Sequence, residues 1–172
     1  MLKKIILYCI LFNSAFAQFN FNNSVATQHF VSNNSHAQPH VFDSSLTRAA
    51  LDAETASIVA LTYDPNSYKT LEHLAQRYFT VSGWQDFMTP KLQNARKLLN
   101  KNNNHTNVII QSWPKLRAQK HSNIVLAAFE VKVNLYDNDK QLAQQKLQLL
   151  LQMQPNFKLN NWQVVHWSSR LL

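Results

Sequence analysis

The spacing of hydrophobic positions changes once along the chain, near residue 105. Before that point, apolar residues recur at steps of three and four, which is the period of an α-helix with one buried face. After it, apolar and polar residues alternate one by one, as in a strand with one buried face. The pattern predicts an α+β fold in which N-terminal helices pack on one face of a curved antiparallel sheet.

The first helix is expected to follow a serine cap at Ser44 or Ser45 and to carry an alanine-rich apolar stripe. Small side chains at this spacing favour a helix that lies close against its neighbours. Asp64-Pro65 interrupts the stripe, because proline disfavours helical geometry in the residue before it and lacks an amide donor. The same pair is expected to start a second helix, with Asp64 as its N-cap and Pro65 in its first turn.

The second helix is expected to end near Thr80, and a third is expected to open at Trp84 and reach Leu99, with Pro90 in its first turns. Gly83, the only glycine of the chain, lies between them. A glycine just past a helix end commonly adopts the left-handed conformation, so we expect a positive φ at Gly83. Trp84 is expected to be a buried wedge between the third helix and the sheet.

About four antiparallel strands are predicted in the second half, with a hairpin turn at residues 137–139. The Leu- and Gln-rich segment after this turn would suit a helix by propensity, but the hairpin context favours a strand. In the last strand, alternation places His166 on one face with Trp162 and Val164, so His166 is expected to be half buried. The predicted strands are 108–113, 124–136, 140–153 and 162–171.

The N-terminus has the pattern of an export signal. A lysine pair precedes a continuous apolar run over residues 5–12, and Ala15 and Ala17 supply the small residues that a signal peptidase requires. As a helix, the run would cover roughly 12 Å, against about 30 Å for the hydrocarbon core of a bilayer. We therefore predict a signal peptide over residues 1–17, cleaved after Ala17, and a periplasmic or secreted protein without a stable membrane span.

The exported part is expected to be a single folded domain behind a tether. Cleavage would remove Cys9, the only cysteine, so no disulfide could form. Residues 18–45 are rich in Asn, Ser, Gln and His without apolar periodicity and are predicted to be a disordered polar tether. Residues 46–172 are enough for one α+β domain.

Charge is distributed unevenly along the chain. Residues 18–86 hold three basic and six acidic side chains, whereas residues 87–172 hold twelve basic and three acidic ones. The basic half is either a solvated face of an exported protein or a surface for weak contact with an anionic membrane or an acidic partner. No arginine-rich run or aromatic RNA-binding strand is present in the sequence, so no nucleic-acid partner is predicted.

No catalytic, cofactor-binding or metal-binding motif is found in the sequence. A single glycine rules out a phosphate-cradling loop, and the histidines after residue 45 are far apart in the chain. Asp64, Asp86, Glu130 and His166 are the candidates for acid–base chemistry, and each also has a structural interpretation. His166 is retained as the pocket group of an alternative function, a periplasmic small-ligand-binding or isomerase-like protein.

The helical half contains two aromatic motifs: the first comprises Tyr63, Asp64 and Tyr68, and the second comprises Tyr78, Phe79, Thr80, Gly83, Trp84 and Phe87. Together they resemble the opening of the periplasmic domain of the DotI/IcmL family of type IVB secretion system proteins. Leu61 stands where the family often has an aromatic residue. The similarity is specific from about residue 56 to 87 and only topological from 108 to 172.

This resemblance implies the cone-shaped fold of nuclear-transport-factor-two-like proteins, which the periplasmic domains of type IV secretion assembly factors share. It also implies a non-enzymatic protein that assembles with envelope secretion-complex proteins or with itself. Family members are typically anchored by one transmembrane helix. The N-terminal apolar run of this chain is too short for such a helix, so we expect a soluble exported relative. The alternative is that the short run is retained uncleaved as an anchor. The shared aromatic residues recur at helical spacing and are expected to belong to the core rather than to a partner site.

Overall fold

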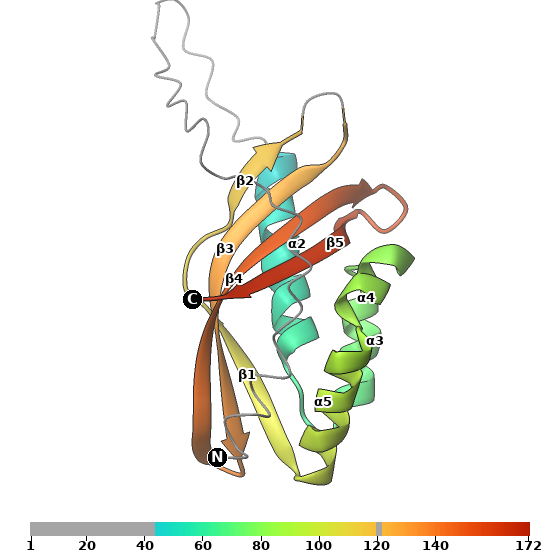
Figure 1. Ribbon diagram of the computed structural model, residues 1–172. Coiled ribbons are helices and arrows are strands. Elements are labelled where there is room, and N and C mark those ends of the chain that lie inside the picture. Colours follow the sequence, from blue (N-terminus) through green and yellow to red (C-terminus); the bar gives the residue numbers. More distant parts are fainter. Residues whose placement is uncertain (1–43, 120–121) are drawn as a thin grey trace, which may run out of the picture.

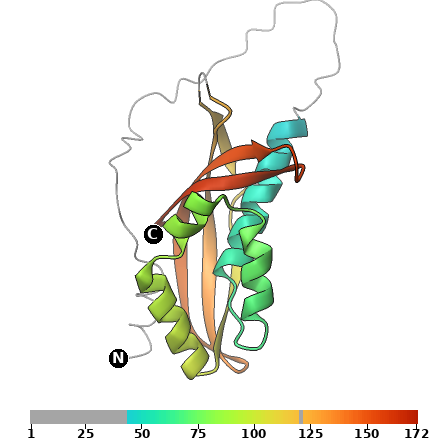
Figure 2. The same cartoon turned by 90° about the vertical axis from the view of Figure 1, so that its right-hand side faces the viewer.

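Helices lie along one side of a twisted antiparallel sheet in a computed structural model that describes residues 44–119 and 122–172 (Figure 1). A view turned by 90° shows the helices drawn in green in front of the long strands (Figure 2). The α+β fold class predicted from the sequence is confirmed. The helices are α2 (Ser44–Leu61), α3 (Tyr68–Gln76), α4 (Val81–Phe87) and α5 (Pro90–Lys101). The strands are β1 (Asn104–Ile110), β2 (Lys115–Ala118), β3 (Val125–Asp137), β4 (Lys140–Asn156) and β5 (Asn161–Leu171).

The sheet is ordered β1–β3–β4–β5, and β2 pairs with the first part of β3, beyond the end of β1. All of these neighbours are antiparallel. β3 and β4 form a long hairpin whose turn contains Asn138 with a φ of 52°, a left-handed conformation that asparagine tolerates. The Leu- and Gln-rich segment is therefore a strand, as the turn before it predicts.

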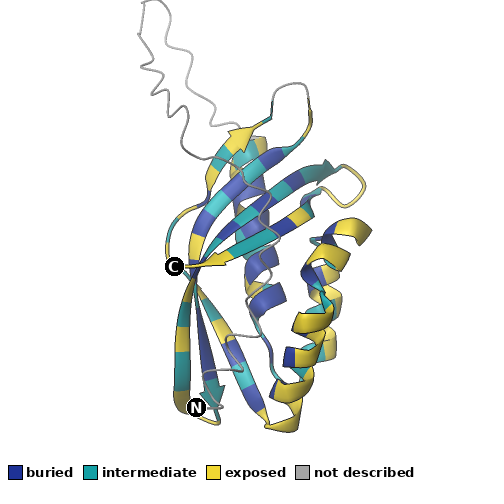
Figure 3. Ribbon diagram, in the orientation of Figure 1, coloured by how far each residue is buried: buried dark blue, intermediate teal, exposed yellow. Residues whose placement is uncertain are grey.

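The sheet face turned toward the helices forms the hydrophobic core. Along β4, every second residue from Leu147 to Met153 is fully buried, while the residues between them are partly exposed (Figure 3). α2 packs on this face through small side chains, and Ala49, Ala53 and Ala56 have no exposed surface. Because no long side chain separates the two elements at these positions, the helix lies close to the strands.

The second predicted helix starts later and ends earlier than predicted, since it stops at Gln76 and not near Thr80. α3 begins at Tyr68 after Ser67, so Asp64 is not its N-cap and Pro65 is not in its first turn. The Asp64 carboxylate instead accepts hydrogen bonds from the backbone N–H of Asn66 and the hydroxyl of Ser67, both at 2.9 Å. Asp64 therefore closes a tight turn between the two helices, an arrangement that aspartate also favours.

The third predicted helix is two helices, which gives four helices in the described residues where three were expected. α4 ends at Phe87 and α5 begins at Pro90. The Thr89 hydroxyl accepts a hydrogen bond from the backbone N–H of Leu92 at 3.3 Å and caps α5. Proline is pre-organised for the first position of a helix, so Pro90 starts a new helix instead of lying inside an existing one.

Gly83 and Trp84 also differ from expectation. Gly83 lies within α4, and its φ is not positive. A Cβ at Gly83 would overlap the carbonyl oxygen of Val164 in β5 and come within 2.8 Å of the carbonyl carbon. Glycine is therefore required by close approach to a strand, not by backbone conformation. Trp84 is only partly buried and packs on the edge of the core instead of forming a fully buried wedge.

The strands differ from prediction in three places: the start of β1, the presence of β2 and the alternation within β5. β1 starts at Asn104, four residues before the predicted start, and β2 was not predicted. β5 contains a register shift opposite Gln152 and Met153, which places one extra residue, Val165, between two paired residues. This bulge reverses the alternation, so Trp167 is buried and His166 is exposed, contrary to the expectation for His166.

The predicted signal peptide, with Ala15 and Ala17, and nearly all of the predicted tether lie outside the described residues. The signal peptide over residues 1–17 and the tether over residues 18–45 therefore stay predictions. Among residues 44–119 and 122–172, no helix has the length and the apolar character needed to cross a membrane.

Candidate functional site

The first family-like motif lies at one edge of the sheet. Tyr63 pairs with Thr106 of β1: the Thr106 N–H donates to the Tyr63 carbonyl at 2.8 Å, and the Tyr63 N–H donates to the Thr106 carbonyl at 3.3 Å. The Thr106 hydroxyl also donates to the Leu61 carbonyl at 2.8 Å. The Tyr63 ring stacks on Tyr68, with centroids 5.8 Å apart. These contacts join the end of α2 to an edge strand and satisfy backbone groups there.

The second motif lies at the opposite edge, on β5. Val164 donates its N–H to the Tyr78 carbonyl at 2.8 Å, and its carbonyl accepts the Thr80 N–H at 2.9 Å. The Thr80 hydroxyl accepts the N–H of Gly83 at 3.1 Å and thereby caps α4. The chain thus leaves the turn after α3 and runs beside β5, to which a parallel bridge at Phe79 joins it.

Four aromatic rings fill the space between this edge and the helices. Phe79 lies 5.4 Å from Trp84, 5.6 Å from Phe87 and 5.9 Å from Trp167, measured between ring centroids. Phe79 and Phe87 are buried, Trp167 is 9% exposed, and Trp84 covers the cluster from outside. Offset and edge-on aromatic pairs of this kind stabilise a core beyond their buried area. The aromatic members of the second motif therefore have structural contacts within the fold.

Arg96 links α5 to the three other described helices and was not identified from the sequence. Its guanidinium donates to the carbonyl of Ala60 in α2 at 2.9 Å, lies 3.8 Å from the Glu72 carboxylate in α3, and lies 5.7 Å from the centroid of the Phe87 ring. Burial lowers the pKa of Arg96, an effect that Glu72 partly offsets. The signal was present, because position 96 falls on the same helical stripe as Leu92 and Leu99.

His166 and Asp86 form an ion pair on the surface. The His166 Nδ1 atom lies 2.5 Å from the Asp86 Oδ2 atom, and the two side chains are 48% and 43% exposed. The structure thus brings together two of the acid–base candidates, one from α4 and one from β5. The pair is open to water and is not enclosed in a cavity where a substrate could be held away from solvent.

The other candidates are separate from this pair. Glu130 is exposed on β3, and Asp64 is engaged in its turn. The hydrogen bonds to Asn66 and then to Ser67 hold the pKa of Asp64 below its usual range. Within the described part of the chain, no group of three or more His, Cys, Asp or Glu side chains is arranged to hold a metal ion.

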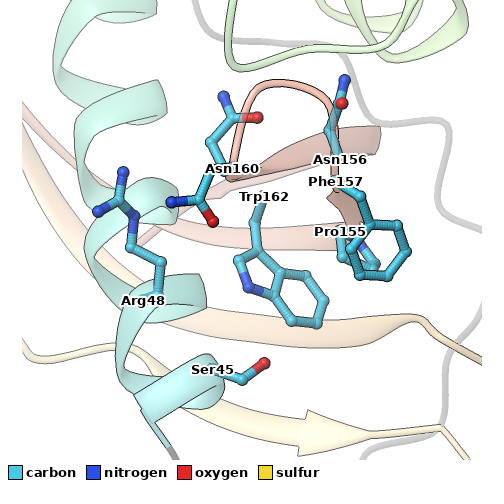
Figure 4. Close-up of a pocket in the computed structure, with 8 residues that line it drawn as sticks. Ser45, Arg48, Pro155, Asn156, Phe157, Asn160 and Trp162 are labelled. Atoms are coloured by element: carbon cyan, nitrogen blue, oxygen red, sulfur yellow. The ribbon is translucent and has the colours of Figure 1, made fainter.

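A pocket of about 410 Å³ lies between the start of α2 and the turn that joins β4 to β5 (Figure 4). Trp162 occupies its centre, with Arg48 on one side and Phe157 and Pro155 on the other. The buried carboxylate of Asp52 accepts hydrogen bonds from the Trp162 backbone N–H at 2.8 Å and from the Arg48 Nε at 3.2 Å. Asp52 thus holds both Trp162 and Arg48 in position in the pocket.

The β4–β5 turn beside this pocket exposes apolar side chains. Phe157 is 85% exposed and Leu159 is 52% exposed, both in the β4–β5 turn. An aromatic floor, an exposed aromatic rim and an arginine are the residue types that are enriched at protein contact sites. His166 does not line the pocket, so the group expected for the ligand-binding alternative lies elsewhere. This site could not be predicted from the sequence, since its parts are more than 100 residues apart in the chain.

The same arrangement of helices on one face of a twisted antiparallel sheet is found in solved structures of type IV secretion proteins. An IcmL-like type IV secretion protein from Legionella pneumophila has a TM-score of 0.65 at 19% identity, over 73% of this chain and 92% of that one. The periplasmic domain of DotI has a TM-score of 0.63 at 18% identity, over 80% and 99% of the two chains. VirB8 of Agrobacterium tumefaciens has a TM-score of 0.52 at 9% identity, over 81% and 97%.

These structural matches confirm the fold that the resemblance of the two motifs implies. No protein-family model and no curated protein matches the chain.

Proposed function

We propose that this protein is an exported, non-enzymatic component that works by protein–protein assembly with envelope secretion-complex proteins. The observation that carries the proposal is the fold. The described residues match nearly the full length of periplasmic domains from type IV secretion proteins, with 92% and 99% of two such chains covered. Fold alone does not fix function, so the proposal also depends on what the surface offers.

Two features of the described residues favour assembly over catalysis. Tyr63, Tyr78, Phe79 and Thr80 make contacts that hold the edges of the sheet and the start of α4, which leaves them with structural roles. The acid–base candidates do not converge on an enclosed cavity, because His166 and Asp86 meet on the surface. An enzyme of this class would need an ionisable group directed into a pocket.

The pocket beside the β4–β5 turn is the surface that we assign to the partner. Phe157 and Leu159 expose apolar area that the fold does not use, next to Trp162 and Arg48. Exposed apolar residues that are clustered and rimmed by polar ones mark contact sites. Asn156 and Asn160 supply the polar rim.

Site-specific photo-cross-linking in the native host tests the proposal. A photoreactive amino acid at position 157 should yield adducts with a subunit of the envelope secretion complex, identified by mass spectrometry. The matched control is the same substitution at Lys101, an exposed residue at the end of α5, far from the β4–β5 turn in Figure 1. Adducts at 157 and not at 101 support the assignment.

Affinity capture of the protein through a C-terminal tag, which leaves the pocket unmodified, provides the second measurement. Recovery of no envelope-complex subunit under conditions in which the host secretes would contradict an assembly role. Equal adducts at both positions would contradict the assignment to the pocket while leaving assembly in place.

A further inference from the structure

The outer face of the sheet, opposite the helices, carries an unusual set of charges. We propose that this face docks on an anionic lipid bilayer through a cationic surface that runs across four strands. This inference goes beyond the proposed function and does not depend on it. The cationic surface comprises Lys115 and Arg117 of β2, Lys132 of β3, Lys146 of β4 and Arg170 of β5.

Strand register places these side chains on one face. In β2, Leu116 packs against the core and pairs with the buried Ala127, so its neighbours Lys115 and Arg117 point the other way. Lys132 lies between the buried Val131 and Val133 and therefore also points outward. Directly paired residues of an antiparallel ladder share a face.

The same rule extends the surface to the far edge. Lys132 pairs with Lys146, and Arg170 pairs with Gln148, the second residue after Lys146. Adjacent strands are about 4.8 Å apart and residues about 3.3 Å apart along a strand, so the surface covers roughly 14 by 20 Å. α2 lies behind β3 and β4 in Figure 1, which leaves this side of the sheet without a covering helix.

The fold itself does not neutralise these charges. Lys132 and Lys146 are direct cross-strand partners, an arrangement in which like charges oppose sheet stability. The ion pairs found among the described residues involve Arg48, Arg96 and His166, none of which belongs to the cationic surface. On the outward positions of the described strands, Glu130 is the only carboxylate. An external anionic partner would offset the repulsion.

Exposed apolar side chains accompany the cations. Ile109 is 45% exposed and pairs with Lys132. Trp113, in the connection between β1 and β2, is 56% exposed and lies two residues before Lys115. Cations beside an exposed tryptophan are typical of surfaces that bind the headgroup region, where the indole ring is stable at the boundary between water and lipid.

A lipid surface fits these observations better than an acidic protein does. The charges are spread over four strands, whereas a protein anchor site concentrates its contacts in a pocket. A bilayer with anionic headgroups presents a broad sheet of negative charge and needs no matching shape. The attraction would act over about 8 Å at physiological salt, so contact has to be close.

Co-sedimentation of the purified full chain with vesicles tests the proposal. Vesicles containing phosphatidylglycerol should bind the protein at low salt, and pure phosphatidylcholine vesicles should not. Lys132→Glu combined with Lys146→Glu should reduce binding by at least about 20-fold, since each cation near a membrane contributes about fivefold. The matched control is Lys69→Glu combined with Lys101→Glu, which makes the same charge change on exposed helical residues.

The two double variants have equal net charge, so only the position of the charge differs. Binding lost in the sheet variant and kept in the control supports the proposal, provided that both melt within a few degrees of the parent chain. Equal loss in both would overturn it in favour of a net-charge effect. Binding to polyglutamate but not to anionic vesicles would also overturn it and would indicate an acidic protein partner.

Discussion

The β3–β4 hairpin and the junction of residues 78–87 with β5 depend on different kinds of information. In the hairpin, the contacts that fix each residue come from nearby in the chain, through the turn at Asn138-Asp139. At the junction, the decisive partner of Thr80 and Gly83 is Val164, more than 80 residues away. The hairpin could be described from local pattern, whereas the junction could not.

The reason is physical. A strand with one buried face must alternate, and a hairpin must turn where its residues allow it, so both rules can be applied within a short window. Close approach of a glycine to another strand leaves no local pattern, because a glycine at a helix end, in a turn or beneath a strand looks the same in sequence. The junction needs the tertiary fold before its residues can be interpreted.

The strongest test of this difference is Gly83→Ala. An alanine Cβ would overlap the Val164 carbonyl, and backbone atoms cannot move aside as a flexible side chain can. We expect the free energy of unfolding to fall by about 3 kcal/mol and Tm by roughly 10 °C, as for overpacking in a core. Thermal and urea unfolding of the purified chain would measure both quantities.

Gln85→Ala is the matched control, since Gln85 is exposed in the same helix. Its stability should stay within about 0.5 kcal/mol of the parent chain. A Gly83→Ala variant as stable as the control would show that α4 moves away from β5 easily, and the junction would then not be fixed by this contact.

The sequence predicted the fold class and the long strands because both depend on local spacing. It missed the break between α4 and α5 because Pro90 is equally compatible with the first turn of one helix and with the start of another. It misplaced His166 because a single bulged residue in β5 reverses the alternation. The pocket was not foreseen, since Arg48 and Phe157 meet only in the folded chain.

Trp84 gives the next largest effect and separates a core residue from a contact residue at the junction. Its ring packs edge-on against Phe79 at 5.4 Å, yet part of it remains exposed. We expect Trp84→Ala to reduce the free energy of unfolding by about 2 kcal/mol, less than for a fully buried tryptophan. Urea unfolding measures this loss.

Trp113→Ala is the control for this variant, because Trp113 is 56% exposed. Its unfolding free energy should change by less than about 0.5 kcal/mol. If Trp84→Ala were as stable as Trp113→Ala, the Trp84 ring would not contribute to the core. The result would then favour Trp84 as a contact residue.

The smallest expected effect on stability is at Asp64, whose hydrogen bonds all lie within a short local turn. Hydrogen bonds from the Asn66 backbone and the Ser67 hydroxyl lower the pKa of Asp64 in the folded chain below its unfolded value of about 3.9. A lowered pKa contributes stability that is fully present above the unfolded pKa and is lost as pH falls through the folded pKa. Asp64→Asn keeps an acceptor oxygen but cannot titrate, so its Tm should lie slightly below that of the parent at neutral pH and converge with it in acid.

Thermal melts from neutral to acidic pH measure this difference in Tm, with Asp139→Asn in the exposed β3–β4 turn as the charge-matched control. A gap that stays constant as pH falls would mean that the carboxylate does not stabilise the turn by its charge.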